Sequence, residues 1–144
     1  MKPSYIHLRS GQVPPKLEIH PYKLIIVAEA VVPEAWRNEV AEWIYQIGSR
    51  YVIAWGQSCE KWHDSVDWAN LGAFDFGVVP DEDHVMTSWH AKEPLSEAFW
   101  FAGFCAHHPE VELGETIILH ISEEERSEEM LAQYHESQII EPGD

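Results

Sequence analysis

Basic residues are scarce in this sequence. Only 9 Lys and Arg stand against 25 Asp and Glu, which leaves a formal net charge of -16 on 144 residues. Nucleic acids and anionic lipid surfaces are bound mainly through Lys and Arg, which displace counterions from phosphates. The charge therefore argues against DNA, RNA and membrane partners and favours a basic protein partner, a metal cation or a cationic substrate. The alternative is that the charge only keeps an aromatic-rich protein in solution.

Cysteine is scarce as well, with Cys59 and Cys105 as the two examples. The sequence shows no secretory leader and no apolar run of about 20 residues, the length that a membrane-spanning helix needs. We therefore expect a cytoplasmic protein with two free thiols, since disulfides belong to oxidising compartments. A chain of this length buries enough surface to fold without a disulfide or a structural metal.

A glycine-rich phosphate motif is missing. The first expected strand is followed by Ala30-Val31-Val32-Pro33, and no Gly-Lys-Ser/Thr sequence occurs anywhere in the chain. Backbone amides of a glycine-rich turn at a helix N-terminus are the groups that cradle a pyrophosphate. The absence of such a turn argues against a nucleotide cofactor.

The sequence contains apolar runs that alternate with helical patterns. This alternation indicates an α/β fold. Continuous Ile, Val, Leu and aromatic runs are typical of strands buried on both faces. Strands are expected at 23–29, 51–55, 84–89 and 116–121. Helices are expected at 33–47, 58–73, 94–106 and 122–134. Right-handed crossovers then predict a three-layer sandwich with a four-stranded, mainly parallel sheet, for which we assume the order 2-1-3-4.

The ends of the chain are expected to differ from its middle. Residues 1–22 are rich in proline and are expected to form an N-terminal arm, with a candidate extra edge strand at 5–8. A single α/β domain is expected at 23–136, and residues 137–144 are expected to form a loose C-terminal tail. The Ser-x-x-Glu capping box at 122–125 is expected to open the last helix.

At the carboxyl edge of the sheet, the assumed strand order brings Glu29 close to His90. Ligands of open α/β sheets bind at the carboxyl ends of strands where the strand order reverses. A carboxylate beside an imidazole suits general acid-base catalysis or a mononuclear metal site, with Trp55, Gln57 and Trp89 nearby. The alternative is that Glu29 caps a helix or pairs with Arg37, and that His90 satisfies a backbone group.

A second cluster lies on the helix expected after the second strand. Cys59 and His63 are four residues apart and share one helix face, and the helix dipole favours a thiolate in the first turn. Asp67 follows one turn later, where it would orient His63. The pattern predicts a thiol nucleophile at Cys59, or a divalent metal site formed by His63, Asp64 and Asp67. The alternative is a half-buried cysteine beside solvated polar residues.

The expected strand at 116–121 carries one histidine, His120. A histidine on the face of a buried strand is more often a hydrogen-bonded core residue than a ligand. We therefore expect a structural role for it.

Several segments resemble a family of small bacterial α/β domains of unknown function. The resembling segments are 54–59 (AWGQSC), 64–70 (DSVDWAN), 85–90 (VMTSWH), 93–95 (EPL) and 99–102 (FWFA). The resemblance covers most of residues 23–134. It implies a bacterial, cytoplasmic, single-domain protein, and it carries no activity or catalytic residue to this chain.

Two kinds of function remain after these exclusions. The acidic charge, the seven Trp and the nearly all-apolar pattern of 94–106 favour a non-catalytic binding or regulatory domain. Such a domain would dock a protein partner through acidic and aromatic surface, since aromatic anchors inside a charged rim are the usual energetic core of an interface. The alternative is a small enzyme or metal-binding protein with its site at the carboxyl edge, with Glu29, His90 and Cys59 as catalytic residues. A homodimer formed through 94–106 or an edge strand is a third possibility.

Overall fold

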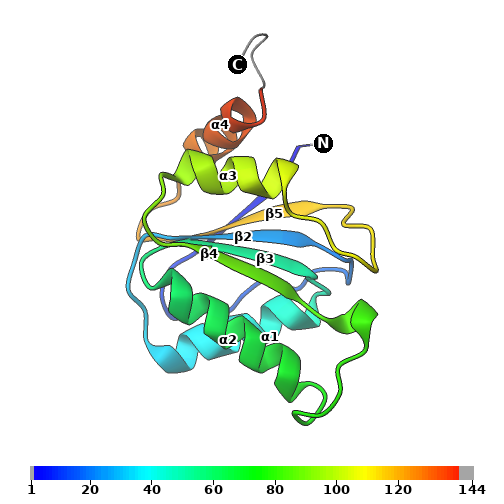
Figure 1. Cartoon of the computed structure of the whole chain (residues 1–144). Coiled ribbons are helices and arrows are strands. Elements are labelled where there is room, and N and C mark those ends of the chain that lie inside the picture. Colours follow the sequence, from blue (N-terminus) through cyan, green and yellow to red (C-terminus); the bar gives the residue numbers. More distant parts are fainter. Residues whose placement is uncertain (1, 140–144) are drawn as a thin grey trace.

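A parallel sheet forms the middle layer of the fold (Figure 1). The computed structural model of the chain describes residues 2–139. Its strands are β1 (Ser4–Leu8), β2 (Lys23–Ala28), β3 (Tyr51–Gly56), β4 (Met86–His90) and β5 (Thr116–Ile121). They lie in the order β1-β5-β2-β3-β4, and every pairing between neighbours is parallel.

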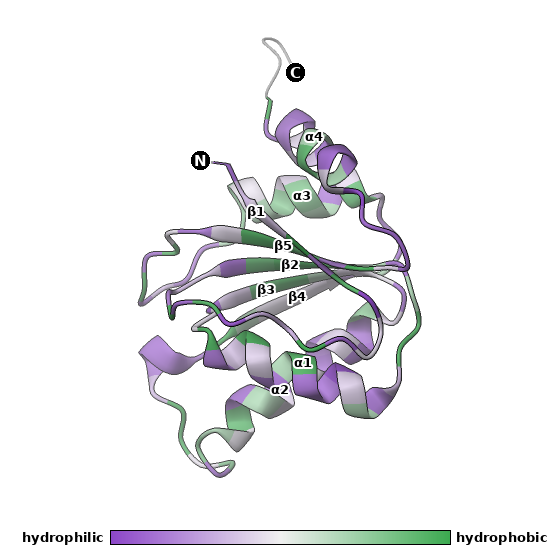
Figure 2. Cartoon of the chain, turned by 180° about the vertical axis from the view of Figure 1, so that it is seen from behind, coloured by the Kyte–Doolittle hydropathy of each residue, from purple (hydrophilic) through white to green (hydrophobic). Residues whose placement is uncertain are grey.

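Helices cover both faces of this sheet (Figure 1). One face carries α1 (Glu34–Gln46) and α2 (Cys59–Gly72), and the other carries α3 (Leu95–Phe104) and α4 (Ser127–Ser137). A short turn of 3₁₀-helix, η1 (Asp81–Asp83), precedes β4. The hydropathy colours of Figure 2 show that apolar residues concentrate on β2, β3 and β5. The prediction of an α/β sandwich with a parallel sheet is therefore confirmed.

The strand β2 lies at the centre of the sheet, between β5 and β3. Leu24, Ile25, Ile26 and Val27 have no exposed surface, because helices cover both faces of the strand. Alternate residues point to opposite layers, so Leu24 and Ile26 pack toward α1 and α2, and Ile25 and Val27 pack toward α3. The continuous apolar run in the sequence is explained by this double burial.

The edge strand expected in the N-terminal arm is present. β1 pairs with β5, with Ser4 opposite Ile117 and Leu8 opposite Ile121. The arm then crosses the molecule to reach β2. A hydrogen bond from the indole N–H of Trp36 to the carbonyl of Gln12 holds it against α1. The sheet therefore has five strands rather than four.

The strand order assumed from the sequence is wrong. β2 is flanked by β3 and β5, and β4 lies at the edge of the sheet beyond β3. The chain proceeds outward from β2 through β3 to β4, and α3 then carries it back over the opposite face to β5 (Figure 1). The strand order therefore reverses at the carboxyl ends of β2 and β5, which is where such sheets form ligand sites.

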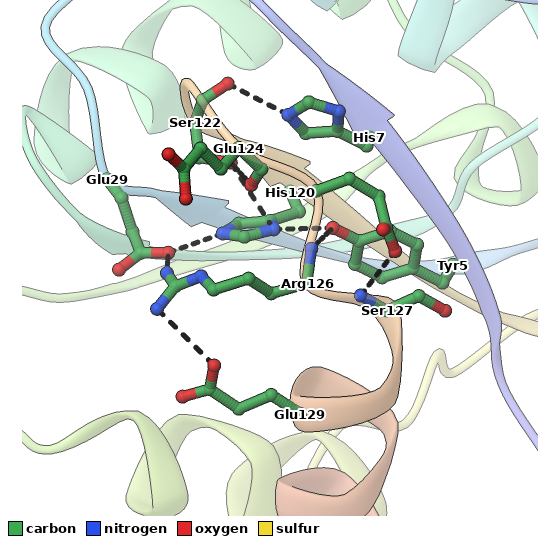
Figure 3. A network of polar contacts seen from close by, with 10 residues as sticks. Tyr5, His7, Glu29, His120, Ser122, Glu124, Arg126, Ser127 and Glu129 are labelled. Carbon is green, nitrogen blue, oxygen red and sulfur yellow. Dashed lines mark hydrogen bonds and ion pairs between the residues drawn. The ribbon is translucent and has the colours of Figure 1, made fainter.

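The expected capping box does not open the last helix. α4 begins at Ser127, five residues after Ser122. The backbone N–H of Ser122 donates to the carbonyl of Leu8 at 3.2 Å, so this residue still belongs to the sheet edge. Glu125 accepts a hydrogen bond from the N–H of Ser127 at 2.6 Å instead of bonding back to Ser122. The intervening residues form a loop that brings Arg126 to the carboxyl edge (Figure 3).

The tail expected at 137–144 falls mostly outside the described residues, which end at 139. Its first residue, Ser137, is the last residue of α4, and Gln138 donates from its side chain to the carbonyl of Phe99 at 2.8 Å. In the described part of the chain, no helix combines the length and the apolar character that crossing a membrane requires.

Candidate functional site

The site begins where β2 and β5 end side by side. Glu29 directly follows β2, and its N–H donates to the carbonyl of Ile121, the last residue of β5, at 2.9 Å. His120 precedes Ile121 and has no exposed surface. The imidazole Nε2 of His120 and the Oε1 of Glu29 form a hydrogen bond across the junction of the two strands.

Both ring nitrogens of His120 have a partner (Figure 3). Nδ1 lies 2.6 Å from the hydroxyl oxygen of Tyr5, and that oxygen accepts the backbone N–H of Arg126 at 3.1 Å. The Tyr5 O–H is therefore the donor to Nδ1 of His120. The imidazole then carries its hydrogen on Nε2, and this N–H donates a hydrogen bond to Glu29. We call this set the switch-point network: Tyr5, Glu29, His120 and Arg126.

The guanidinium of Arg126 joins this network to α4. It forms an ion pair with Glu29 and a longer one, of 3.5 Å, with Glu129 (Figure 3). Glu29 therefore pairs with Arg126 and not with Arg37, whose Nε donates to the hydroxyl of Ser65 at 3.0 Å. Through this pair the network connects β1, β2, β5 and the start of α4, and so joins both ends of the chain to the central strand.

Burial and pairing shift the pKa values within the network. Burial raises the pKa of Glu29, but hydrogen bonds from Arg126 and His120 outweigh burial and hold the pKa of this carboxyl below its ordinary value. Burial also lowers the pKa of His120, against the opposing effect of Glu29. The hydrogen bond to Glu29 raises the pKa of Arg126. At neutral pH the network thus holds one anion, one cation and a neutral imidazole.

A nucleophile for this histidine is not in place. The hydroxyl of Ser122 lies 3.5 Å from Nδ1 of His120, but it donates to the carbonyl of Glu124 at 2.7 Å. Nδ1 is already occupied by Tyr5. The arrangement is therefore a satisfied hydrogen-bond network that fixes the strand ends, which agrees with the core role expected for His120.

His90 lies farther along the same edge, and β3 separates it from Glu29. Its Nδ1 is 2.8 Å from Oε2 of Glu93, and its Nε2 is 3.2 Å from the hydroxyl of Ser88. The proximity of Glu29 and His90 that we derived from the assumed strand order is therefore not observed. Each of the two residues instead belongs to its own histidine–glutamate pair.

Between these two pairs the carboxyl edge is hollowed into a crevice with a volume of about 430 Å³. Its lining residues are Ala28, Glu29, Trp55, Gly56, Gln57, Ser58, Ala91 and Glu93. Of the residues that the sequence placed near Glu29, Trp55 and Gln57 line the crevice, whereas Trp89 packs on His63 instead. Glu93 is a lining residue that the sequence reasoning missed. The parallel strands explain this partial success, because their carboxyl ends share one edge in any order.

The loop after β3 shapes this crevice. Gly56 has a φ of +99°, and a Cβ at this position would lie 2.1 Å from the carbonyl oxygen of Ala28. Only glycine allows the two backbones to approach so closely. Ser58, with a φ of +56°, is also left-handed, and the N–H of Gln57 donates to the carbonyl of Ala28 at 2.7 Å. The crevice wall is therefore fixed by backbone contacts.

Cys59 and His63 do not face one another as a nucleophile and base. Cys59 is 3% exposed and packs into the core between the sheet and the helices α1 and α2. His63 lies 3.1 Å from a carboxylate oxygen of Asp64 and 3.3 Å from one of Asp67, and its ring packs on Trp89 at 4.5 Å. The contact between His63 and Asp67 that the spacing predicts is present.

A metal site is not evident in the described residues. Within 2–139, no group of three or more His, Cys, Asp or Glu side chains is placed to hold a metal ion. The metal-binding role of His63, Asp64 and Asp67 and the catalytic role of Cys59 stay predictions.

A second hollow, an open groove of about 1130 Å³, lies along α1 and α2. Its apolar lining comes from Val32, Tyr45, Trp68, Ala69, Ala73 and Phe76. Its charged lining comes from Glu34, Arg37, Glu42, Lys61 and Asp64. The groove therefore combines aromatic surface with carboxylates, which is the combination that the composition suggested.

Trp68 and Phe76 form an exposed aromatic pair in this groove. Their side chains are 64% and 58% exposed, and their rings meet edge to face at 5.0 Å. Asp75 and Phe76 have φ values of +52° and +60°, a conformation that is strained for a bulky residue. The turn after α2 thus holds Phe76 against Trp68 despite backbone strain.

Sequence reasoning found Glu29 but missed its partners. One available signal was Arg126, the only Lys or Arg after Lys92, which stands alone in a segment crowded with glutamates. An isolated cation in such surroundings is expected to pair with a carboxylate. The other signal was His120, placed next to the end of a strand, where a parallel neighbour also ends.

The comparisons with known proteins give a family but no activity. No curated protein and no solved structure matches the chain. A family model described as "Domain of unknown function (DUF7684)" matches residues 3–137. The match extends from β1 to α4 and includes the switch-point network, the crevice and the groove. The chain therefore belongs to this family of domains of unknown function.

Proposed function

We propose that this protein is a non-catalytic binding domain that docks a basic protein partner in the groove between α1 and α2. The observation that carries the proposal is the exposed pair of Trp68 and Phe76, held in the groove by a strained turn. Large aromatic side chains surrounded by a polar rim supply most of the binding energy in protein interfaces. Strain retained at an exposed position points to a use of the side chain that the fold itself does not require.

The charge around the groove supports a basic partner. In the lining itself, the carboxylates of Glu34, Glu42 and Asp64 stand against Arg37 and Lys61. The two helices carry three further carboxylates outside the lining, Glu39, Glu60 and Asp67, and no further Lys or Arg. Arg37 already donates a hydrogen bond to Ser65. The net charge of -16 on the whole chain adds long-range attraction for a cationic partner and raises the rate of encounter.

The shape of the groove supports a helical segment as the element that docks. Two neighbouring helices with an apolar channel between them are the usual receptor for an amphipathic helix. The apolar face of such a helix would contact Tyr45, Trp68 and Phe76, and Lys or Arg residues along its flanks would meet the carboxylates of α1 and α2.

The catalytic alternative has less support. Glu29, His90 and Cys59 were its three residues, but β3 separates Glu29 from His90, and Cys59 packs into the core. The hydrogen bonds of His120 are satisfied within the chain. Because these candidate catalytic residues are separated or buried, a binding function has more support than a catalytic one.

The test uses a synthetic amphipathic helix with a leucine face and Lys and Arg flanks, and a second peptide with Glu at the charged positions. We expect the basic peptide to bind, and its affinity to fall as salt is raised from about 50 to about 300 mM. The variant Trp68→Ala should weaken binding by about tenfold or more, because it removes an interface anchor. Its matched control is Trp100→Ala, which alters an exposed tryptophan of α3 on the opposite side of the sheet.

Two results would contradict docking in this groove. One is equal binding of the basic and acidic peptides. The other is an equal loss of affinity in Trp68→Ala and Trp100→Ala, which would place the peptide elsewhere or indicate non-specific hydrophobic binding.

A further inference from the structure

We infer that the crevice at the carboxyl edge is a separate binding site for a small organic cation, a primary ammonium or guanidinium compound. The crevice shares no lining residue with the groove between α1 and α2. Its volume of about 430 Å³ suits a small molecule rather than a protein segment. The inference therefore does not depend on the proposed docking function.

Two glutamates, Glu29 and Glu93, line the crevice, and each forms a hydrogen bond with a histidine. His120 bonds to Oε1 of Glu29, and His90 bonds to Oε2 of Glu93 at 2.8 Å. Both histidines are buried. Arg126 also contacts Oε1 of Glu29, so these contacts leave Glu29 Oε2 and Glu93 Oε1 for a ligand. Each carboxylate is thus oriented before a ligand arrives, which lowers the cost of ordering it on binding.

A tryptophan, Trp55, also lines the crevice. Trp55 occupies the end of β3, the strand that separates Glu29 from His90. Its Nε1 donates to the backbone carbonyl of Glu93 at 2.7 Å, which fixes the ring in the crevice. Tryptophan is the side chain that attracts organic cations most strongly through its ring face. A fixed indole beside carboxylates is therefore a suitable receptor for an ammonium or guanidinium group.

The charge balance selects a cation over an anion. The lining contains two glutamates, Glu29 and Glu93, and no Lys or Arg, and Arg126 pairs with Glu29 from outside it. The remaining negative charge favours a monocation and repels phosphate or carboxylate ligands. The polar side chains of Gln57 and Ser58 supply additional hydrogen-bonding groups for the rest of the ligand.

The crevice is also preformed. The close contact of Gly56 with the carbonyl of Ala28, and the hydrogen bond from Gln57 to the same oxygen, lock the loop after β3. A site on a locked loop loses little conformational entropy when it is filled.

The experiment follows the indole N–H resonance of Trp55 by NMR, assigned with the variant Trp55→Phe, during titration of defined probes. The cationic probes are n-butylammonium and methylguanidinium, and their neutral counterparts are n-butanol and methylurea. We expect a saturable shift with at least one cation, and no saturable shift with the neutral compounds or with inorganic phosphate. The two cations also distinguish an ammonium site from a guanidinium site.

The variant Glu93→Gln provides the decisive comparison, because glutamine keeps the size of the side chain and its hydrogen bond with His90. We expect it to weaken binding of the cation by about tenfold, as removal of a charged hydrogen-bond partner does. Its matched control is Glu97→Gln, an exposed change in the first turn of α3 outside the crevice. This control should bind as the wild type does.

The inference is overturned if neither cation gives a saturable shift, if the neutral compounds bind equally well, if phosphate binds in their place, or if Glu97→Gln weakens binding as much as Glu93→Gln. Its failure is distinct from failure of the docking function, since Trp68→Ala lies outside the crevice and should leave cation binding unchanged.

Discussion

His120 donates a hydrogen bond from Nε2 to the carboxylate of Glu29, across the junction where β5 and β2 end. The pair stands at the point where the strand order reverses. Tyr5 bonds to the imidazole and Arg126 pairs with the carboxylate (Figure 3), so this pair attaches an edge strand and the last helix to the centre of the sheet.

The first prediction concerns the stability that this pair supplies. Glu29→Ala leaves the buried N–H of His120 without an acceptor and removes the ion pair of Arg126. We expect the free energy of unfolding to fall by about 2 to 3 kcal/mol, the usual cost of an unsatisfied buried donor together with a lost ion pair. Urea denaturation measures this change. Glu34→Ala, an exposed change at the start of α1, is the control and should alter the free energy by less than about 0.5 kcal/mol.

The second prediction concerns pH. Both Glu29 and His120 have pKa values below their ordinary ones, so for each of them the unfolded chain binds protons more readily than the folded protein. Their contribution to stability is therefore complete above the ordinary pKa of histidine, 6.5, and is lost as the pH falls through the lower folded values. As the pH falls, protonation of His120 lowers the stability first, and protonation of Glu29 lowers it further at lower pH.

Urea unfolding measured at several pH values between about 7.5 and 4.5 tests this order. The variant His120→Gln should show a shallower decline of stability between pH 6.5 and 5 than the wild type, because the titrating imidazole is gone. A decline of the same slope in both proteins would show that other groups are responsible.

The sequence predicted the central layer of the fold correctly for a physical reason. Residues 24–28 of β2 form a run without a polar side chain, which is typical of a strand covered on both faces. The helix expected at 33–47 is present as α1, and its stripe of Trp36, Val40 and Ile44 is buried. Local periodicity determines which segments are strands and helices, and here it was sufficient.

The strand order was not predictable from these local patterns, because it depends on which face of the sheet each crossover helix covers. One signal was nevertheless available. β4 contains Thr87 and Ser88, which remain partly exposed, whereas the middle of β5 is a run of Ile and Leu at 117–119 and the strand is almost entirely buried. Polar residues in β4 mark it as an edge strand, and a central place for β5 would have brought His120 to Glu29.

The third prediction concerns the loop that shapes the crevice. Gly56→Ala would place a Cβ 2.1 Å from the carbonyl oxygen of Ala28, in a left-handed conformation that alanine disfavours. We expect a loss of about 2 to 4 kcal/mol in the free energy of unfolding, since the backbone contact cannot relax. Gly114→Ala is the matched control, because a Cβ there meets no atom within 4 Å. It should leave stability unchanged or raise it by up to about 1 kcal/mol.

The fourth prediction separates binding from stability at the aromatic pair. Phe76 has a φ of +60°, where glycine is unstrained, so Phe76→Gly relieves backbone strain while it loses the ring contact with Trp68. These effects oppose one another, and we expect the free energy of unfolding to change by less than about 1 kcal/mol. Binding of the basic peptide should nevertheless fall by about tenfold, because the anchor is removed.

The same substitution in a helix provides the comparison. Phe104 is 37% exposed at the end of α3, so Phe104→Gly should lower the free energy of unfolding by about 1 kcal/mol through loss of helix propensity and packing. It should leave peptide binding intact, since α3 covers the opposite face of the sheet from the groove. If Phe76→Gly weakened binding only as much as Phe104→Gly does, the strained turn after α2 would serve the fold and not the partner.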